Sequence, residues 1–302
     1  MSEVSLRQLE YLVAAAEAGS VTAASSRLHL SQSAVSTALS DLEATLQVQL
    51  FIRHPRGMSV TRVGQQVLTD ARRLLSGVED LRNSARDASE SLSGRLVVGC
   101  YSTLSPILLP RVIADFTAQH PTVDLSFVEG SHAYLEEQLR TGLLDLAILY
   151  DYDFEKLGHV HDLATTRVLT SPPYVLLPED HRLAGKARIR LAQVAAEPMI
   201  LFDLPPGGDY FRSLFETEDL VPAVRFRTTS FEMVRALVAR GLGYSILSQR
   251  TEIAESYEGR RFATAELGGP HRGLDVSAVT LRRARLTRRA EAFIEQCIES
   301  LA

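Results

Sequence analysis

Apolar residues in the first sixty positions recur at helical spacing in three short blocks, and each block follows a residue that favours a helix start. Ser5 and Gln8 form a capping-box pair ahead of the first block, and Gly19 is placed to end it. Ser20 and Ser31 stand at the expected N-caps of the second and third helices. Three short helices with a tight connection between the second and third predict a helix-turn-helix.

The outer face of the third predicted helix is polar but carries no charge. Its inner face repeats apolar residues from Val35 to Leu46. Short polar side chains fill the outward positions: Gln32, Ser33, Ser36, Thr37 and Ser40. Such side chains let a helix sink close to base edges and donate or accept hydrogen bonds there. A solvated face, the alternative, usually carries Lys and Glu, so the pattern favours a DNA-reading helix.

Two short strands are predicted after the third helix, at residues 50–53 and 58–61. The segment HPRG between them is a turn sequence with proline and glycine. A hairpin in this place is a wing, and Arg53 and Arg56 would reach DNA phosphates or the minor groove. Surface solubility is the alternative role for these two arginines.

Residues 61–89 lack proline, and their apolar positions alternate at spacings of four and three. The predicted seam consists of Val67, Ala71, Leu74, Val78 and Leu81. This is the a/d repeat of a coiled coil over about three heptads, on a helix of roughly 40 Å. A helix packed on its own domain is the alternative. Pairing of two chains would place two recognition helices on a two-fold axis, suited to an inverted-repeat DNA site.

Beyond the polar segment SESLSG at 89–94, strands and helices alternate. Strands are predicted at 95–100, 123–128 and 145–150, with helices at 107–119 and 134–140, an order that implies a parallel sheet. A second set has strands at 174–177, 199–202, 224–227 and 244–247, with helices near 210–215 and 231–238. A strand at 276–281 and a helix from about 287 close the chain. Two α/β lobes of this kind leave a cleft at the strand ends.

Hydroxyl side chains follow the predicted strand ends that would face this cleft. They are Ser102, Thr103, Ser131, Thr229 and Ser230. Ser105 and Pro106 suit the N-cap and first position of the helix after the first strand. Converging helix N-termini would favour an anionic ligand such as a carboxylate, whereas plain N-caps facing solvent are the alternative. Phe202 and the stiff segment after it are expected at the same rim.

Composition and charge refine this picture. The chain has 302 residues, 45% hydrophobic and 23% charged, as in an ordinary globular protein. A net charge of −5 argues weakly against nucleic acid, but between positions 18 and 69 the only acids are Asp41 and Glu43, beside four arginines. No signal peptide and no apolar run of ~18 residues is present, so no membrane partner is expected. Cys100 and Cys297 cannot form a disulfide framework, which favours a reducing cytoplasm.

The segment LRQLEYLVAAAEAGSVTAASSRLHLSQSAVSTALSDLEATLQVQLFIRHPRGMSVTRVG resembles the winged helix-turn-helix of LysR-type transcriptional regulators through its whole length. The resemblance implies base contacts from Gln32, Ser33, Ser36 and Thr37, with Ser31, Arg53 and Arg56 nearer the DNA backbone. It implies a DNA-binding domain at 1–60, a linker helix for dimerisation at 61–90 and an effector domain at 91–302. That domain would resemble periplasmic binding proteins, with lobe I at 91–164 and 269–302, lobe II at 165–268, and Phe202 lining the effector pocket.

The function predicted is sequence-specific DNA binding, modulated by a small molecule held between the lobes of a homodimer or homotetramer. The alternative is a constitutive DNA-binding regulator whose lobes serve only assembly. RNA polymerase is the further partner expected of such a regulator. An enzyme ranks third, because GxSxG, P-loop, GxGxxG and HExxH motifs are absent. His159, His161 and Asp162 lack a clear fourth ligand, so no metal or other cofactor is predicted.

Overall fold

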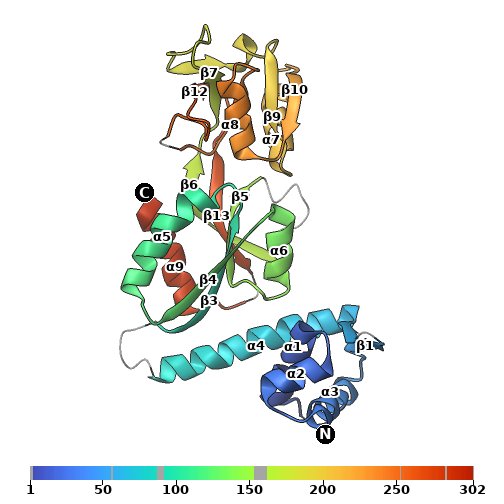
Figure 1. Cartoon of the computed structure of the whole chain (residues 1–302). Coiled ribbons are helices and arrows are strands. Elements are labelled where there is room, and N and C mark those ends of the chain that lie inside the picture. The colour runs from blue at the N-terminus through green and yellow to red at the C-terminus, as the bar shows by residue number, and fades with distance from the viewer. Residues whose placement is uncertain are drawn as a thin grey trace.

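The computed structural model describes residues 3–55, 57–86, 92–152, 162–251, 253–282 and 284–301. Three parts follow one another along the chain: a small helical domain, a long helix and a pair of α/β lobes (Figure 1). Each of the small domain and the two lobes has its own cluster of buried apolar residues. The predicted fold class is therefore confirmed.

The small domain is a winged helix-turn-helix. Its elements are α1 (Leu6–Ala18), α2 (Val21–Leu28), α3 (Gln32–Leu46), β1 (Phe51–His54) and β2 (Gly57–Val60). The predicted capping box of Ser5 with Gln8 is present, and Gly19 ends α1 in the left-handed conformation. Ser20 and Ser31 cap α2 and α3 as predicted. These local signals place α3 with its apolar stripe against α1 and α2 and its polar stripe outward.

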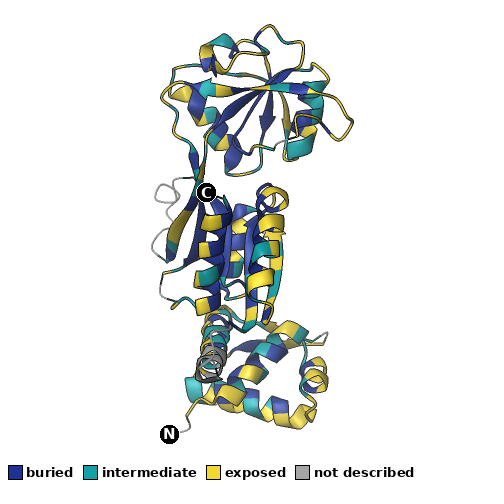
Figure 2. Ribbon diagram, turned by 90° about the vertical axis from the view of Figure 1, so that its left-hand side faces the viewer, coloured by how far each residue is buried: buried dark blue, intermediate teal, exposed yellow. Residues whose placement is uncertain are grey.

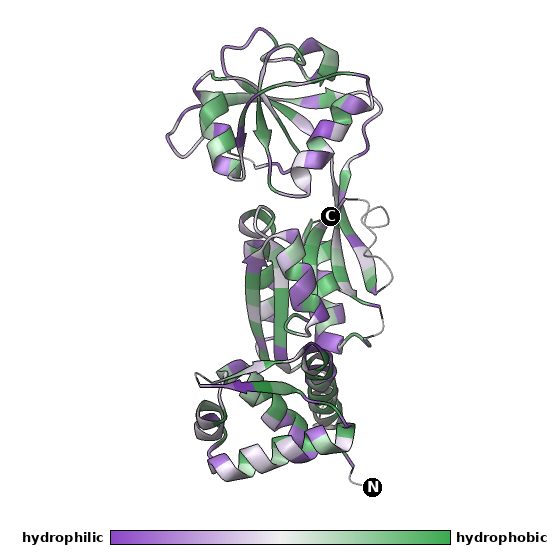
Figure 3. Cartoon of the chain, turned by 90° about the vertical axis from the view of Figure 1, so that its right-hand side faces the viewer, coloured by the Kyte–Doolittle hydropathy of each residue, from purple (hydrophilic) through white to green (hydrophobic). Residues whose placement is uncertain are grey.

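The long helix α4 (Arg62–Arg86) begins directly after the wing and packs along α1. Leu68 and Ala71 are buried in the core of the small domain, and Val67 packs against it. The first turns of α4 are thus part of the winged helix-turn-helix. In the two lobes, by contrast, apolar residues gather in the strands of the sheets (Figure 3).

The first lobe contains a five-stranded sheet in the order β4-β3-β5-β13-β6. Its elements are β3 (Gly94–Tyr101), α5 (Ser105–Gln119), β4 (Val123–Gly130), α6 (His132–Arg140), β5 (Leu146–Asp151), β6 (Leu163–Ser171), β13 (Leu274–Leu281) and α9 (Arg288–Leu301). The predicted parallel arrangement holds for β4, β3 and β5. Helices α5 and α9 cover one face and α6 the other (Figure 1), so the strands are the most buried part of the lobe (Figure 2).

The second lobe contains a four-stranded sheet, β11-β7-β12-β8, and a parallel pair, β10-β9. Its elements are β7 (Tyr174–Pro178), β8 (Arg188–Arg190), the short 3-10 helix η1 (Leu191–Gln193), β9 (Pro198–Phe202), α7 (Gly207–Glu216), β10 (Ala223–Thr228), α8 (Phe231–Ala239), β11 (Ser245–Leu247) and β12 (Phe262–Gly268). Tyr244, the residue before β11, exchanges backbone hydrogen bonds with Pro198 and Ile200 and so links β9 to β11.

Strands β6, β8 and β12 were not predicted. Strand β6 pairs antiparallel with β13 along its whole length, so the sheet of the first lobe is mixed rather than parallel. Residues 165–171, which the sequence-based boundary assigns to lobe II, are hydrogen-bonded in the sheet of the first lobe. Strands β6 and β13 are also the two segments that pass between the lobes (Figure 1).

Candidate functional sites

The outward face of α3 is the first candidate site. Gln32, Ser33 and Thr37 are exposed, and Ser36 is half-buried. Ser31 accepts a hydrogen bond from the Ala34 amide (3.2 Å), and its hydroxyl lies 3.0 Å from that of Ser33. The hydroxyl of Ser31 is thus committed to the helix start, whereas the side chains after it present uncharged donors and acceptors to solvent.

The wing lies directly beside this face. Arg53 of β1 donates from Nη2 to the hydroxyl of Ser36, at 3.2 Å. Gly57 begins β2 with a φ of +136°, and a Cβ there would lie 2.5 Å from the carbonyl oxygen of Gly19. The wing therefore sits against the turn after α1 and carries one arginine onto α3. Arg56, the other predicted wing contact, lies outside the described residues.

Glu43 is a positioning residue that the sequence-based analysis did not find. Its Oε1 accepts from the backbone amides of Leu50 (2.7 Å) and Phe51 (3.1 Å). Because Glu43 is on α3 and these amides begin the wing, the carboxylate ties the recognition helix to the hairpin. The only signal for this role in the sequence was an acidic residue three positions before Leu46, the end of the predicted helix, with an apolar strand after it.

Further along α4, two apolar side chains stand in solvent. Leu74 is 57% exposed and Leu81 is 69% exposed, and they lie about two helical turns apart. Val78 lies between them and is half-buried. By contrast, Ala71 is fully buried within its own chain. The open apolar stripe thus comprises the later residues of the predicted seam.

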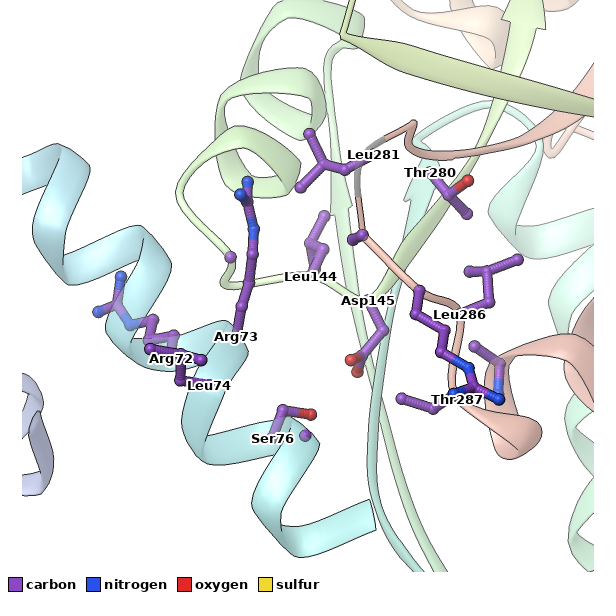
Figure 4. A pocket seen from close by; sticks show the side chains of 15 residues that line it. Arg72, Arg73, Leu74, Ser76, Leu144, Asp145, Thr280, Leu281, Leu286 and Thr287 are labelled. Atoms are coloured by element: carbon purple, nitrogen blue, oxygen red, sulfur yellow. Dashed lines mark hydrogen bonds between the residues drawn. The ribbon is translucent and has the colours of Figure 1, made fainter. Parts of the chain in front are cut away.

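The middle of α4 meets the first lobe around a cavity of about 300 Å³ (Figure 4). Arg72 donates to the carbonyl of Thr141 (3.1 Å), and Arg73 to that of Arg140 (3.5 Å). In Figure 4, Arg73 and Ser76 lie on the helix side and Asp145 lies opposite, on the lobe. These contacts join the linker helix to the loop that follows α6.

A chain of ion pairs runs along α6 to this junction. Glu136 contacts Nδ1 of His132 and Nη2 of Arg140, both at 3.0 Å, and the side chains of His132 and Glu136 are only 5% and 6% exposed. Arg140 also pairs with Asp162 at 3.0 Å. Burial would raise the pKa of Glu136, but its hydrogen bonds and charge contacts with His132 and Arg140 more than offset this and hold the pKa below its usual value.

The second candidate site lies between the lobes and consists of two adjoining hollows. The aromatic crevice is almost filled by its own side chains, at about 10 Å³, and is lined by Thr103, Tyr150, Phe202, Phe211, Phe231 and Gln249 among others. The interlobe cavity beside it measures about 510 Å³ and is lined by Asp151, Tyr152, Asp209, Tyr210, Arg272 and Asp275 among others. Tyr152 and Leu274 form walls of both hollows.

A run of aromatic rings connects the lobes at this place. The rings of Tyr150 and Tyr152 lie 5.7 Å apart, and those of Tyr152 and Tyr210 lie 6.0 Å apart at an interplanar angle of 60°. Tyr152 follows β5 in the first lobe, whereas Tyr210 is on α7 in the second. Burial raises the pKa of Tyr210 to about 12 and that of Tyr152 well above its usual value, so both phenols are neutral.

Only part of the predicted effector set lines these hollows. Thr103 and Phe202 line the aromatic crevice. The hydroxyls of Ser131 and Ser230 accept from the amides of Tyr134 and Met233, so they act as N-caps of α6 and α8. Ser102 and Thr229 are exposed and are not among the lining residues. Ser105 is not an N-cap, because the cap position of α5 is Leu104, which has helical backbone angles and no side-chain cap bond.

Among the described residues, no group of His, Cys, Asp and Glu side chains could hold a metal ion. His159 and His161, the two histidines of the weak metal candidate, lie outside the described part. Asp162 is described and is paired with Arg140 instead. No helix in the described ranges is long and apolar enough to cross a membrane.

Comparison with known proteins shows which family combines these two sites. The family model described as "LysR substrate binding domain" matches residues 89–302, and the one described as "Bacterial regulatory helix-turn-helix protein, lysR family" matches residues 6–65. The chain belongs to the LysR family of transcriptional regulators. It is therefore a DNA-binding regulator with an effector-binding domain, and not an enzyme.

Relatives of this LysR regulator align along nearly the whole chain. YvbU, an uncharacterized regulator of Bacillus subtilis (strain 168), is 32% identical over 301 residues, covering 98% of each chain. The crystal structure of HinK from Pseudomonas aeruginosa shares 35% identity over 99% of each chain, with a TM-score of 0.67. Full-length OxyR from the same organism has a TM-score of 0.75 at 25% identity, over 98% of each chain.

One curated relative, the "Hydrogen peroxide-inducible genes activator" of Escherichia coli, is 30% identical over 81% of this chain and 79% of its own length. In this LysR regulator both cysteines, Cys100 and Cys297, are free and fully buried in the first lobe. Burial raises the pKa of both thiols. Because the thiolate is the form that reacts with peroxide, neither cysteine is poised for oxidation.

We therefore expect that a thiol reagent such as DTNB reacts with neither cysteine in the folded protein and with both after denaturation. Hydrogen peroxide should leave DNA binding unchanged. Thiol titration and a gel-shift assay with and without peroxide check this. A fast-reacting thiol in the folded chain would contradict the burial of Cys100 and Cys297.

Proposed function

We propose that this LysR regulator reads an inverted-repeat promoter site as a homodimer or homotetramer. The uncharged outward face of α3, with Arg53 held against Ser36, is the observation that supports the proposal most directly. Ser33, Ser36 and Thr37 have the short hydroxyl side chains suited to close approach to base edges, and Gln32 adds an amide. Ser31 and the wing arginines Arg53 and Arg56 are proposed to lie nearer the DNA backbone.

We further propose that a small molecule bound between the lobes changes how the DNA is held, and so how RNA polymerase is engaged. The interlobe cavity and the paired aromatic rings of Tyr152 and Tyr210 support this over a constitutive regulator whose lobes serve only assembly. A ligand that touches both lobes can change their angle. The junction of Arg72 and Arg73 with the loop after α6 lies between that cavity and the DNA-binding domain.

The DNA-reading proposal is tested by selecting binding sequences from a random duplex pool. We expect the Ser36→Ala variant to lose discrimination at one or two base pairs, by about tenfold, because a base-edge contact is worth about 1–3 kcal/mol. Arg53→Ala should weaken binding to all DNA sequences by about tenfold. It should also reduce the slope of log affinity against log salt concentration by about one.

Thr45→Ala serves as the matched control. Thr45 lies on α3 as well, but its hydroxyl donates to the carbonyl of Asp41 within the helix (2.8 Å), so its removal should leave selection unchanged. Identical discrimination by Ser36→Ala and the wild type would overturn the assignment of the recognition face. Loss of discrimination in Thr45→Ala would show instead that truncating any side chain on α3 has the same effect.

A further inference from the structure

We infer that the cavity between α4 and the first lobe, which we call the junction cavity, binds a small oxyanion with two or more negative charges. The site is separate from the interlobe cavity, so the inference goes beyond the proposed function and does not depend on it. It rests on the charges that line the junction cavity, on the incomplete neutralisation of its arginines, and on the arginine-rich segment that forms one wall.

The charged side chains that line the junction cavity are mostly basic. Arg72 and Arg73 line it from α4, and Arg285 lines it from the loop between β13 and α9. Asp145 is the only acidic lining residue in the described part of the chain. It is already engaged, because its Oδ2 accepts from the backbone amide of Val97 at 2.7 Å. The cavity, of about 300 Å³, is thus a basic hollow on a chain with a net charge of −5.

Arg72 is only partly neutralised by the protein around it. Its carboxylate partner, Glu17, lies 3.7 Å away and also pairs with Arg27 at 2.7 Å. Its other acceptor is the neutral carbonyl of Thr141. Burial lowers the pKa of Arg72 by more than the contact with Glu17 raises it, so the positive charge is incompletely compensated where it lies.

The other two arginines have still less counter-charge. Arg73 pairs with Asp70 at 3.4 Å, but Asp70 is 70% exposed, and exposed ion pairs are weak. Its second acceptor is the carbonyl of Arg140. The Nε atoms of Arg72 and Arg73 are both buried without a hydrogen-bond partner, which is costly for a charged donor. No side chain in the described ranges pairs with Arg285. An anion in the cavity would supply the missing negative charge.

The segment LRRARLTRRA at 281–290 forms the wall opposite α4, and neither of the two proposed sites uses it. Its Arg289 is only 4% exposed and donates from Nη2 to the hydroxyl of Ser76 on α4, at 3.4 Å. Figure 4 shows Arg73 and Ser76 on the helix, with Leu286 and Thr287 of this segment across the cavity. Two basic elements that are distant in the sequence therefore face each other here.

A multiply charged oxyanion fits this arrangement better than a cation or DNA. Guanidinium groups bind phosphate and carboxylate oxygens through forked, charge-assisted hydrogen bonds. A cation would add to the repulsion among the arginines. A DNA duplex is too large for the cavity, and α3 lies on the side of the winged helix-turn-helix away from the lobes (Figure 1). Phosphate compounds and polycarboxylates share the required chemistry.

The test uses isothermal titration calorimetry on the full chain, with pyrophosphate and citrate as multiply charged probes and acetate as a singly charged one. We expect the tighter of the first two to bind at one site per chain, and acetate to bind at least about tenfold more weakly. Tighter binding of pyrophosphate indicates a phosphate ligand, and tighter binding of citrate a polycarboxylate. Arg73→Gln and Arg285→Gln should each weaken the tighter probe by about five- to tenfold.

Arg282→Gln is the matched control. Arg282 is exposed, lies three positions before Arg285 in the same segment, and does not line the cavity, so its replacement should leave binding unchanged. Because Arg285 is exposed as well, Arg285→Gln tests the site without disturbing the core. The inference is overturned if neither multiply charged probe binds at millimolar concentration or if acetate binds as tightly. Binding that both cavity variants leave unchanged, or that Arg282→Gln weakens equally, would overturn it too.

Discussion

Replacing both Leu74 and Leu81 with aspartate is expected to convert the proposed dimer into monomers and to lower its affinity for an inverted-repeat site by about 100-fold or more. The two leucines form an open apolar stripe on α4, and a charge at each would have to be buried in a paired helix seam. Without the seam each winged helix-turn-helix binds one half-site alone. The gain from tethering two sites, about 10²–10⁴ in affinity, is then lost.

Analytical ultracentrifugation and a gel-shift titration measure the two effects. Ile253→Asp provides a matched control, because Ile253 is 68% exposed, close to the 69% of Leu81, but lies in the second lobe. The control variant should remain dimeric and bind DNA normally. A double variant at Leu74 and Leu81 that stays dimeric would show that another surface holds the chains together.

The winged helix-turn-helix was predictable because its signals are local. Ser5, Ser20 and Ser31 each cap the helix that follows within the next three residues, and Gly19 ends α1 through its own left-handed conformation. Such features depend on neighbours in the sequence and need no knowledge of the tertiary fold. The apolar stripes then fix which face of each helix turns inward.

The strands β6 and β12 were missed because their partners are distant in the sequence. Strand β6 forms an edge of its sheet, most of its residues are not fully buried, and its ladder is with β13 about a hundred residues later. Neither strand carries a clear alternation of apolar and polar positions. Pairing of this kind depends on tertiary contacts that a short sequence window does not contain.

The proposed effector site was only partly predictable for a related reason. A hydroxyl before a helix is equally suited to bind a ligand or to cap the helix, and the backbone amides of Tyr134 and Met233 claim the hydroxyls of Ser131 and Ser230. Tyr152, Tyr210 and Asp275 come from three separate segments, and only the crossing of β13 between the lobes brings them together.

The polar chain along α6 gives the two sites a physical connection. At one end the ring of His132 lies 6.1 Å from that of Tyr152, a wall of the interlobe cavity. At the other end the carbonyl of Arg140 accepts from Arg73 on α4. On α4, Arg72 pairs with Glu17 of α1 at 3.7 Å. Glu136 is the central member of this chain, and it is the group whose removal we expect to cost most.

The Glu136→Gln variant is expected to be less stable than the wild type by about 3 kcal/mol, which corresponds to a fall of roughly 6–12 °C in the Tm of the two-lobed domain. The amide removes the buried negative charge that both His132 and Arg140 contact, so the ion pair of residue 136 with Arg140 is lost. Differential scanning calorimetry at neutral pH measures the change. Glu137→Gln alters the next, exposed carboxylate on α6 and should leave the Tm within about a degree.

The difference in Tm between the wild type and the Glu136→Gln variant should also depend on pH, in a direction fixed by the pKa of Glu136. Because that pKa is lower in the folded state than in the unfolded chain, ionised Glu136 stabilises the wild type fully above about pH 4.3. This contribution is lost as the pH falls further, through the folded-state pKa. Calorimetry of wild type and Glu136→Gln should therefore give Tm values that converge below about pH 4. A gap that stays constant as the pH falls well below about 4, through the range in which the folded-state carboxyl titrates, would mean that the side chain acts through packing and not through its charge.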